Sequence, residues 1–489
     1  MENHVAVGAD VRRVSLQAVS PKYLSLPMNG SRRQHVRMCG RAGSISPLTP
    51  ALSPLRGEGE GSPKFIGFMP PFFRDLILLN SAATILRHAL IASLFSASLN
   101  AIANDWPQWR GPDRNGISKE KGWSVAWPKE GPRQLWKAAV GTGFSSVAVA
   151  QGRLFTLGNK DETDTVFCFD AENGQDLWKH SYPCALEPIY NEGGPGSTPT
   201  VDGTMVFTIS KRGQVFCFEA ATGKILWQKD LMQELGVGKP RWGFAGSPLI
   251  EGKLLILNVG GAGTALDKVT GNVAWTSDTN TAGYATPIAF TARGERCAAI
   301  FSSKALLGVK VSGGQELWRY PWLTRWDINI ADPILVEDKL FISSFDRGCA
   351  LLRLSEGTPA VVWENKSMAS HFNSCVCLNG FVYGVHGNTD QPEKDLRCVD
   401  LRNGEVKWKH PGLGLGSLMA ADGKLIILSE RGELVVTEAS PDAFKPLEQA
   451  QVLGGKCWTV PVLANGRIYC RNAQGTLVCL DVRAPNRQE

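Results

Sequence analysis

Apolar and polar residues alternate in short runs over most of the chain beyond residue 130. In "TVDGTMVFTISKRGQVFCFEA", two alternating runs flank the turn signal Asp202-Gly203, and a third follows the turn that contains Gly213. A period of two marks half-buried strands, and Asp-Gly marks a tight hairpin turn. The same order of strands and turns returns along the chain, so the pattern predicts consecutive antiparallel strands.

A tryptophan closes each unit of this pattern. It ends "EAATGKILW" at Trp227 and "DLRNGEVKW" at Trp408, and copies recur at spacings of 42 to 49 residues. Four short strands in a period of about 45 residues are the sequence signature of a propeller blade. A residue repeated in this way predicts packing between blades rather than chemistry, and the Gly four or five residues earlier is expected to supply a turn and a flat surface beside it. The predicted structural girdle is Trp136, Trp178, Trp227, Trp275, Trp318, Trp363 and Trp408.

The first strands of the units give the number of blades. There are eight, which begin near Ser145, Ser197, Ser247, Ala285, Ala331, Ser374, Ser417 and Thr459. The last unit supplies only three strands, and the missing fourth matches "RQLWKA" around Trp136. We therefore predict an all-β fold over residues 133–485: an eight-bladed β-propeller of four-stranded antiparallel blades, closed by its N- and C-terminal strands so that no sheet edge is left open at the junction.

One small position of the repeat is occupied by cysteine in four copies. Cys168, Cys217, Cys398 and Cys479 stand in "FCFD", "FCFE", "RCVD" and "VCLD", and Ala265 takes the same place in "TALD". A thiol behaves as a small apolar group. We therefore expect these four cysteines to be buried and unpaired, and the sequence predicts no pairing for the other seven beyond residue 103.

The first hundred residues follow a different pattern. Residues 1–68 lack periodicity and are rich in Arg, Ser, Pro and Gly, so they are expected to be disordered or to precede the true start of translation. From Met69, basic residues precede an apolar run that ends in Ala101-Ile102-Ala103, the form of a signal peptide with its cleavage site.

We predict translation from or near Met69, a signal peptide over residues 69–103 and an N-terminal arm over residues 104–132. The mature chain would then be periplasmic or secreted, with no transmembrane segment after cleavage. The alternatives are a long disordered extension on a cytosolic protein and an uncleaved membrane anchor.

The charge of the chain lies in this N-terminal part. Residues 1–103 contain 11 Lys and Arg against 5 Asp and Glu, which equals the net charge of +6 for the whole chain. The remainder is formally neutral. A neutral body argues against a nucleic-acid partner bound through bulk charge.

The repeat also carries a family resemblance. Its pattern A-x-D-x-x-T-G-x-x-x-W resembles that of quinoprotein-type, pyrroloquinoline-quinone-like β-propeller repeat proteins, and "DWPQWRGPDRNGIS" (105–118) resembles the opening segment of secreted members. This superfamily includes the scaffold lipoprotein of the outer-membrane β-barrel assembly machine and the quinoprotein alcohol dehydrogenases. The resemblance implies the fold and leaves the function open, because the fold carries both kinds of protein.

The dehydrogenase alternative makes demands on particular residues. The resemblance implies adjacent cysteines over the cofactor, and no two cysteines are adjacent here. A calcium site could involve Asp327, Asn329 and Asp332 in "RWDINIADP", although such residues more often hold a loop through hydrogen bonds. His371 with Cys375 or Cys377 in "HFNSCVC" lacks a second paired half, and buried thiols are the alternative. We therefore expect no catalytic residue and no metal, with pyrroloquinoline quinone and calcium as the alternative cofactors.

Candidate binding residues are those that break the repeat. The connections into the first strands carry aromatic and Arg residues, which are typical of binding hot spots. The predicted ligand-binding residues at the channel mouth are Tyr190, Arg241, Trp242, Tyr284, Arg325, Trp326, Asp327, His371 and Trp458. Packing that plugs the channel mouth is the competing interpretation. The sequence thus predicts a non-catalytic binding or scaffold module for a protein, peptide or envelope component, with a quinone-dependent oxidoreductase as the alternative.

Overall fold

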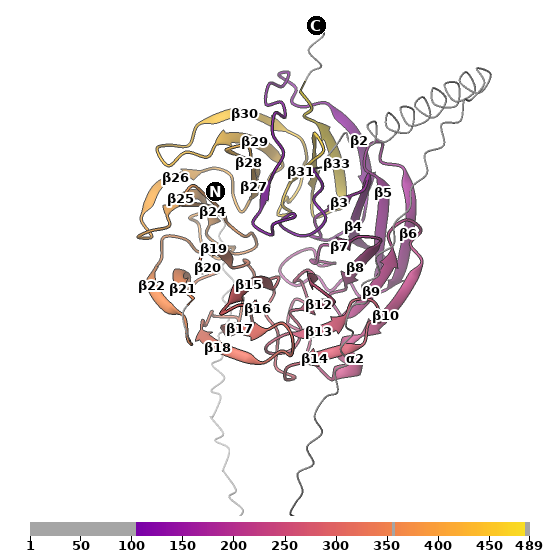
Figure 1. Cartoon of the computed structure of the whole chain (residues 1–489). Helices are drawn as coiled ribbons and strands as arrows, with labels where there is room; N and C mark the ends of the chain where they lie inside the picture. Colours follow the sequence, from indigo (N-terminus) through magenta and orange to yellow (C-terminus); the bar gives the residue numbers. More distant parts are fainter. Residues whose placement is uncertain (1–103, 355–356, 485–489) are drawn as a thin grey trace, which may run out of the picture. The chain divides into compact units, whose positions relative to one another are not determined.

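The chain forms eight four-stranded blades around a central channel (Figure 1). The computed structural model describes residues 104–354 and 357–484. Every blade is antiparallel, and its first strand begins within a few residues of the expected position. The predicted all-β, eight-bladed propeller is therefore confirmed. The predicted extension and signal peptide, residues 1–103, lie outside the described residues.

The four strands of each blade follow one another from the channel to the outside of the ring. The first, innermost strands are β3 (Ala148–Ala150), β7 (Thr200–Asp202), β11 (Leu249–Glu251), β15 (Ile288–Ala292), β19 (Ile334–Val336), β23 (Val376–Leu378), β27 (Ser417–Ala421) and β31 (Val462–Ala464). The second strands are β4 (Arg153–Lys160), β8 (Met205–Ile209), β12 (Leu254–Leu257), β16 (Glu295–Phe301), β20 (Lys339–Ser344), β24 (Phe381–His386), β28 (Lys424–Leu428) and β32 (Arg467–Arg471).

The third strands are mostly buried, and the fourth, outermost strands are the most exposed. The third strands are β5 (Thr163–Asp170), β9 (Gln214–Glu219), β13 (Thr264–Asp267), β17 (Ala305–Lys310), β21 (Gly348–Arg353), β25 (Asp395–Asp400), β29 (Glu433–Glu438) and β33 (Thr476–Asp481). The fourth strands are β6 (Asp176–Pro183), β10 (Ile225–Asp230), β14 (Val273–Thr276), β18 (Glu316–Pro321), β22 (Ala360–Asn365), β26 (Val406–Pro411), β30 (Pro446–Gln451) and β2 (Gln134–Ala139). A short helix, α2 (Leu231–Leu235), follows β10.

The eighth blade joins the two ends of the propeller, as predicted. β2 pairs antiparallel with β33, and Arg133 binds Asp481 at 2.7 Å beside this pair. The seam to the first blade is held by Arg471 of β32, which is buried and donates to the carbonyl oxygens of Ser145 at 2.7 Å and Gly141 at 3.0 Å. Closure pairs the strand edges that an open sheet would leave free.

The repeated tryptophans join each blade to the next. Six of the seven girdle indoles donate their N–H to a backbone carbonyl of the following blade at 2.8–3.2 Å: Trp136 to Ala171, Trp178 to Ala220, Trp227 to Lys268, Trp275 to Val311, Trp363 to Leu401 and Trp408 to Ser440. The indoles are buried or partly buried, and the one donor of each is satisfied. This explains why a tryptophan recurs at the blade boundary.

The turn glycines pack against a different tryptophan from the one expected. A Cβ added to Gly271 would lie 2.7 Å from the ring of Trp227, and one added to Gly223 would lie 2.6 Å from Trp178. Each Gly therefore packs against the tryptophan of the preceding blade rather than the one in its own repeat. Its φ of about +73° at both positions also favours glycine.

The small repeat position lies opposite the tryptophan. Trp227 faces Cys217 across the β9–β10 pair, and Trp275 faces Ala265 across the β13–β14 pair. Cys168, Cys398 and Cys479 face a girdle tryptophan in the same way. A small side chain leaves room for the large ring on the shared face, although Leu351 takes this place opposite Trp363. All eleven cysteines of the described residues are free.

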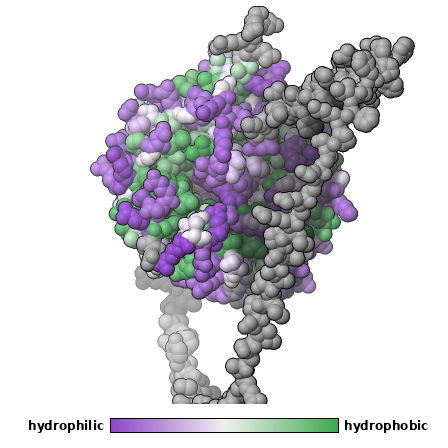
Figure 2. Space-filling model, viewed as in Figure 1, coloured by the Kyte–Doolittle hydropathy of each residue, from purple (hydrophilic) through white to green (hydrophobic). Residues whose placement is uncertain are grey.

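Polar side chains cover most of the propeller face seen in Figure 2, with smaller apolar patches between them. No helix within residues 104–354 and 357–484 is long and apolar enough to cross a membrane.

The N-terminal arm runs along the inner strands of several blades. Trp106 pairs with Val149 of blade one, and Pro107 accepts the N–H of Val201 in blade two at 2.7 Å. The further contacts are Arg114 with the Ile250 carbonyl of blade three, β1 (Ile117–Ser118) in parallel pairing with β27 of blade seven, and Glu120 with the Gly466 N–H of blade eight. The arm therefore braces non-adjacent blades across the ring.

Candidate functional site

The channel wall is held by a ring of hydrogen bonds near the starts of the first strands. In each bond a Ser, Thr or Asp side chain accepts the backbone N–H of the matching residue in the preceding blade. The bonds are 2.7–3.1 Å long. With the N–H donor named first and the side-chain acceptor second, the pairs are Ser146 and Thr198, Thr198 and Ser247, Ser247 and Thr286, Thr286 and Asp332, and Asp332 and Ser374. The first six blades are fixed around the channel in this way.

Asp332 contributes a carboxylate to this ring, so it has a second oxygen that can accept another hydrogen bond. Its Oδ1 accepts the Thr286 N–H, while its Oδ2 accepts the indole N–H of Trp109 and lies 3.9 Å from Nε of Arg110. Burial raises the pKa of Asp332 and lowers the pKa of Arg110, and their mutual attraction opposes both shifts. Both arm side chains are therefore tied to the inner wall of the channel.

The arm forms part of the channel wall. It contacts Glu251 and Ala421 at the ends of first strands, and Asp332 and the Cys375 carbonyl beside the starts of others. The non-repeated connections, such as the one with Trp242, lead into the starts of the first strands. Trp109 of the arm and these connections therefore line one chamber in the channel.

The chamber has a volume of about 510 Å³, which is within the range of ligand-binding sites. Seven of the nine predicted residues line it: Tyr190, Arg241, Trp242, Tyr284, Trp326, His371 and Trp458. Arg325 and Asp327 do not; Arg325 lies outside with its Nε 3.8 Å from Asp346, and Asp327 is half-exposed near Lys304. The structure therefore brings residues of six connections to one cavity. Their role in binding stays a prediction.

One wall of the chamber is a stack of rings. Phe372 lies between His371 and Trp458, with ring centroids 3.7 and 3.9 Å away, and Phe144 stacks on the other side of Trp458 at 5.5 Å. Burial lowers the pKa of His371 to about 3, helped by the charge of Lys394. His371 is therefore a neutral, aromatic part of the wall at ordinary pH.

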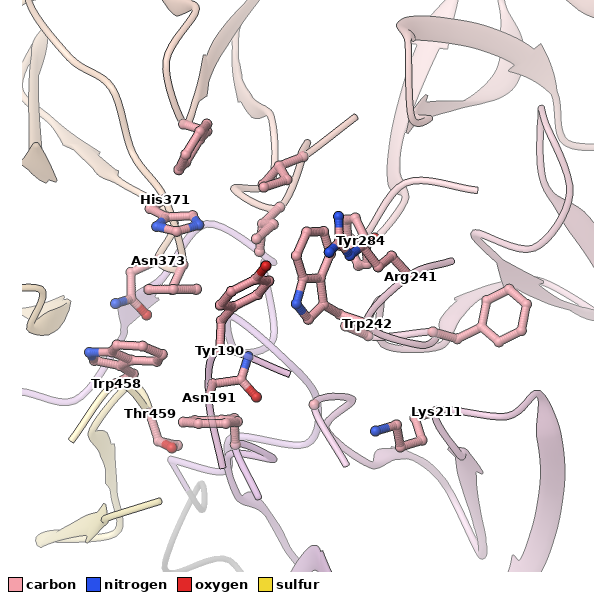
Figure 3. Close-up of a pocket in the computed structure, with 18 of the residues that line it drawn as sticks. Tyr190, Asn191, Lys211, Arg241, Trp242, Tyr284, His371, Asn373, Trp458 and Thr459 are labelled. Carbon is pink, nitrogen blue, oxygen red and sulfur yellow. The ribbon is translucent and has the colours of Figure 1, made fainter. Parts of the chain in front are cut away.

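The opposite wall consists of aromatic rings around the guanidinium group of Arg241. The guanidinium of Arg241 lies 5.6 Å from the ring centroid of Tyr190, 5.1 Å from that of Trp242 and 5.7 Å from that of Trp326. In Figure 3, Tyr190 lies between this wall and the one formed by His371 and Trp458. Such contacts between Arg and aromatic rings contribute about 0.5–1 kcal/mol each at exposed sites.

The loop that presents Tyr190 is held in an unusual backbone conformation. Tyr190 has a φ of +62°, which is costly for a residue with a side chain, and is 81% exposed. The indole N–H of Trp242 donates to the carbonyl of the preceding residue, Ile189, at 3.1 Å. Trp242 thus both lines the chamber and positions Tyr190 over it.

Sequence reasoning missed Lys211 and Glu187, which also line the chamber. Lys211 occupies the hairpin turn "SKRG" between β8 and β9, where a basic residue suggests only a solvent-exposed turn. Trp109 was missed as well, although its position in the arm motif "DWPQWRGPDRNGIS" was a usable signal. Three carboxylates line the chamber, and two of them, Glu187 and Asp332, are engaged by cations.

The proposed calcium ligands do not converge on a site. The side chain of Asn329 is buried and bonded to backbone oxygens of Ser302 and Ser303, and Asp332 holds the arm. His386 accepts the N–H of Ala369. Over the part of the chain that the structure describes, no three His, Cys, Asp or Glu side chains are grouped to hold a metal ion. These residues do not fit a calcium-bound quinone.

A family model described as outer membrane protein assembly factor BamB matches residues 162–410, just over half of the chain. The chain belongs to that family. The match runs from blade one to blade six, and it agrees with the quinoprotein-like repeat recognised in the sequence. No curated protein matches the chain.

Solved structures with this fold include both an assembly factor and dehydrogenases. BamB from Moraxella catarrhalis is 14% identical, with a TM-score of 0.55 over 72% of this chain and 99% of that one. A europium-containing methanol dehydrogenase is 12% identical, with a TM-score of 0.60 over 77% and 89%. Quinohemoprotein alcohol dehydrogenase from Comamonas testosteroni is 13% identical, with a TM-score of 0.61 over 79% and 82%. At these identities the similarity establishes the fold alone.

Proposed function

We propose that this chain is a non-catalytic binding or scaffold module that holds a segment of a partner protein or peptide in the chamber. The observation that carries the proposal is the aromatic rim of the chamber. Tyr190 is 81% exposed and Trp326 is 51% exposed, and both line the chamber. Exposed aromatic residues of this kind supply most of the binding energy when a partner buries them.

The family supports a protein partner in the cell envelope. Its description refers to the assembly of outer-membrane proteins, which requires contacts between proteins outside the cytoplasm. A periplasmic or secreted location follows from the same relationship and from the signal peptide predicted at residues 69–103. The partner itself is left open by the family description.

A quinone-dependent oxidoreductase is the second candidate, favoured by the similarity to the two dehydrogenases. It requires a planar stacking site and a group of oxygen ligands for the metal. The chamber provides rings, but two of the three carboxylates that line it, Glu187 and Asp332, already bind Lys, Arg and Trp side chains, and the third, Asp390, is one ligand rather than a group. The binding function therefore accounts for more of the chamber.

Selection of peptides from a random displayed library against the protein tests the binding function. The dissociation constants of selected peptides are then measured by calorimetry for the wild-type protein, Trp326→Ala and Leu447→Ala. Trp326→Ala is expected to weaken binding by more than about 1 kcal/mol, or about fivefold. Leu447 is the control, because it is 39% exposed but lies on the outer strand β30, away from the channel. Equal affinities for all three proteins would exclude the chamber as the binding site.

Incubation with pyrroloquinoline quinone and calcium, followed by gel filtration, tests the second candidate. We expect no quinone absorbance in the protein fraction. Stoichiometric retention of the quinone that depends on calcium would contradict the binding-module proposal and favour the oxidoreductase.

A further inference from the structure

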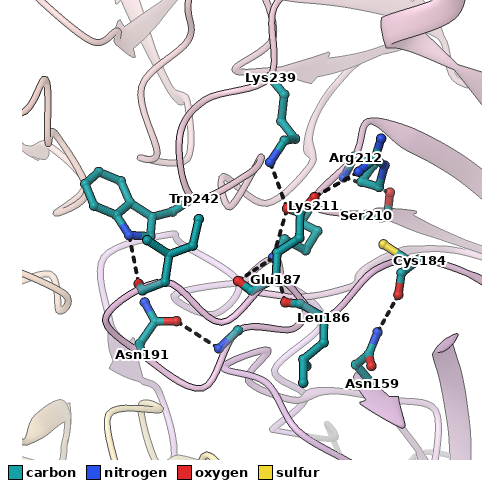
Figure 4. Close-up of polar contacts among 12 residues, drawn as sticks. Asn159, Cys184, Leu186, Glu187, Asn191, Ser210, Lys211, Arg212, Lys239 and Trp242 are labelled. Atoms are coloured by element: carbon teal, nitrogen blue, oxygen red, sulfur yellow. Dashed lines mark hydrogen bonds and ion pairs between the residues drawn. The ribbon is translucent and has the colours of Figure 1, made fainter. Parts of the chain in front are cut away.

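Positive charge gathers on one side of the chamber mouth. Glu187 is bound by three cations: Arg212 at 2.8 Å, Lys239 at 2.7 Å and Lys211 at 3.4 Å. Figure 4 shows these three side chains around the one carboxylate. Burial by itself would raise the pKa of Glu187, but the hydrogen bonds and charges of Lys239 and Lys211 hold it below its ordinary value. The buried Asp164 also interacts with Lys211, so two carboxylates face three cations, and this side of the mouth keeps an excess of positive charge.

Arg241 adds a fourth cation to this surface, which we call the cationic wall (Lys211, Arg212, Lys239 and Arg241). Within residues 104–354 and 357–484, no carboxylate forms an ion pair with Arg241; its neighbours are the rings of Tyr190, Trp242 and Trp326. Contacts with rings use the face of a guanidinium and leave its N–H groups at the edge. Those in-plane groups are the ones that bind a carboxylate in a bidentate manner.

Lys211 makes the wall part of the chamber interior. Its side chain is 3% exposed and lines the cavity, and its ammonium group donates to the carbonyl oxygen of Leu186 at 2.8 Å. Burial lowers the pKa of Lys211, and the charge of Glu187 only partly opposes this. A buried cation with partial compensation favours an anion in the adjacent cavity.

The rest of the mouth has no excess of positive charge, and the exposed carboxylate of Asp390 lines the chamber without an ion pair among residues 104–354 and 357–484. Lys456 pairs with Glu192 at 3.0 Å, and Arg325 and Lys304 each lie near a carboxylate. Cationic ligands would be repelled, because Arg241 already occupies the place among the three rings where a ligand cation would bind. The excess positive charge is thus local to one wall and faces an aromatic cavity.

We propose that the cationic wall recognises carboxylates, and that the chamber takes an acidic segment of a partner protein with an apolar side chain directed at the rings. This inference rests on the proposed binding function and adds the chemistry of the ligand to it. Arg241 supplies the carboxylate contact at the mouth, and Lys211 supplies positive charge deeper inside.

The test uses the displayed library and the tightest peptide selected from it. Selected peptides are expected to be enriched in Asp and Glu. Replacing those residues by Asn and Gln in the tightest peptide should weaken binding about tenfold, the effect of losing one charge-assisted hydrogen bond. Arg241→Gln should weaken binding of the acidic peptide by about the same factor and leave binding of the amide peptide unchanged. Arg325→Gln is the matched control, since Arg325 lies outside the chamber and has Asp346 as a partner.

The outcomes separate this inference from the function on which it rests. Equal binding of acidic and amide peptides, with both weakened by Trp326→Ala, would overturn carboxylate recognition and leave the binding function standing. Equal losses of affinity for the acidic peptide in Arg241→Gln and Arg325→Gln would also overturn carboxylate recognition by Arg241. The effect would then come from the net charge of the protein. Failure of Trp326→Ala to weaken any selected peptide would contradict both. Melting curves of each variant identify any loss of fold.

Discussion

The indole N–H of Trp109 donates to the carboxylate of Asp332, and this contact joins the N-terminal arm to the inner wall of the channel. Asp332 stands where the neighbouring blades have Thr286 and Ser374, so one repeat position has been changed to a carboxylate. Its first oxygen keeps the hydrogen bond of the ring, and its second oxygen binds the arm. This departure from the repeat therefore adds a contact between the arm and the inner wall of the channel.

Asp332→Ser should release the arm without opening the ring. Serine retains an acceptor for the Thr286 N–H but leaves Trp109 without its acceptor and the buried Arg110 without a carboxylate. Breaking a buried ion pair costs up to about 3–5 kcal/mol, and the backbone carbonyls that still accept from Arg110 should reduce this cost. Hydrogen exchange should become faster in residues 106–118 and stay slow in β9 and β16. Thr198→Ser, at the equivalent position and without contact to the arm, should leave both regions unchanged. Unaltered protection of the arm in Asp332→Ser would contradict the assigned role.

Trp227→Ala should lower the free energy of unfolding by about 3–5 kcal/mol, the range for large-to-small changes of buried aromatic residues. The ring closes cooperatively, so the loss should affect more than the blade that carries the residue. Chemical denaturation followed by circular dichroism measures the change. An unchanged denaturation midpoint would show that the girdle does not stabilise the propeller.

Gly271→Ala tests the contact between neighbouring blades from the other side. Both Gly271 and Gly252 have a positive φ, +73° and +59°, but a Cβ at Gly271 would meet the ring of Trp227 whereas a Cβ at Gly252 would meet nothing within 4 Å. Gly252→Ala should cost about 1–2 kcal/mol through its backbone conformation alone. Gly271→Ala should cost a further 1–3 kcal/mol or so through overpacking. Equal melting temperatures for the two variants would argue against close packing at Gly271.

Acidification should destabilise the protein through His371. Its pKa is about 3 in the folded protein because of burial, while an unfolded histidine titrates near the ordinary value of about 6.5. The unfolded chain therefore binds the proton first, and stability is lost as the pH falls from about 6.5 to about 3, by up to about 1.4 kcal/mol per pH unit from this residue. His371→Gln should make the profile less steep over that window. Parallel profiles for the two proteins would rule out this contribution.

Arg471→Met should destabilise the seam between the eighth and the first blade. The guanidinium donates to the carbonyl oxygens of Ser145, Leu157 and Gly141, and methionine would leave these buried acceptors without donors. Each unsatisfied buried group costs about 1–3 kcal/mol. Arg471→Lys should recover part of the loss, because a lysine reaches fewer of the acceptors. In Arg471→Met, limited proteolysis should cut first near β2 or β33. Initial cleavage elsewhere would contradict a local role for Arg471 at the seam.

The sequence by itself determined the propeller. Strand alternation, turn residues and the tryptophan spacing are local signals that repeat along the chain, and a blade uses them within one period of the sequence. The closing strand around Trp136 was also predictable, since the last unit lacked a fourth strand. Even the small residue opposite several of the tryptophans could be read from the repeat, as with Cys217 and Ala265.

The chemistry of the chamber was decided only by the tertiary structure. Arg241-Trp242 and Arg325-Trp326 are the same dipeptide in similar connections, yet Arg241 lies among three rings and Arg325 lies outside beside Asp346. Lys211 reads as an ordinary turn residue, but the fold buries it against Glu187. The reason is physical: the charge, burial and packing of a side chain depend on neighbours that come from other blades, and no local pattern in the sequence specifies which neighbours those are.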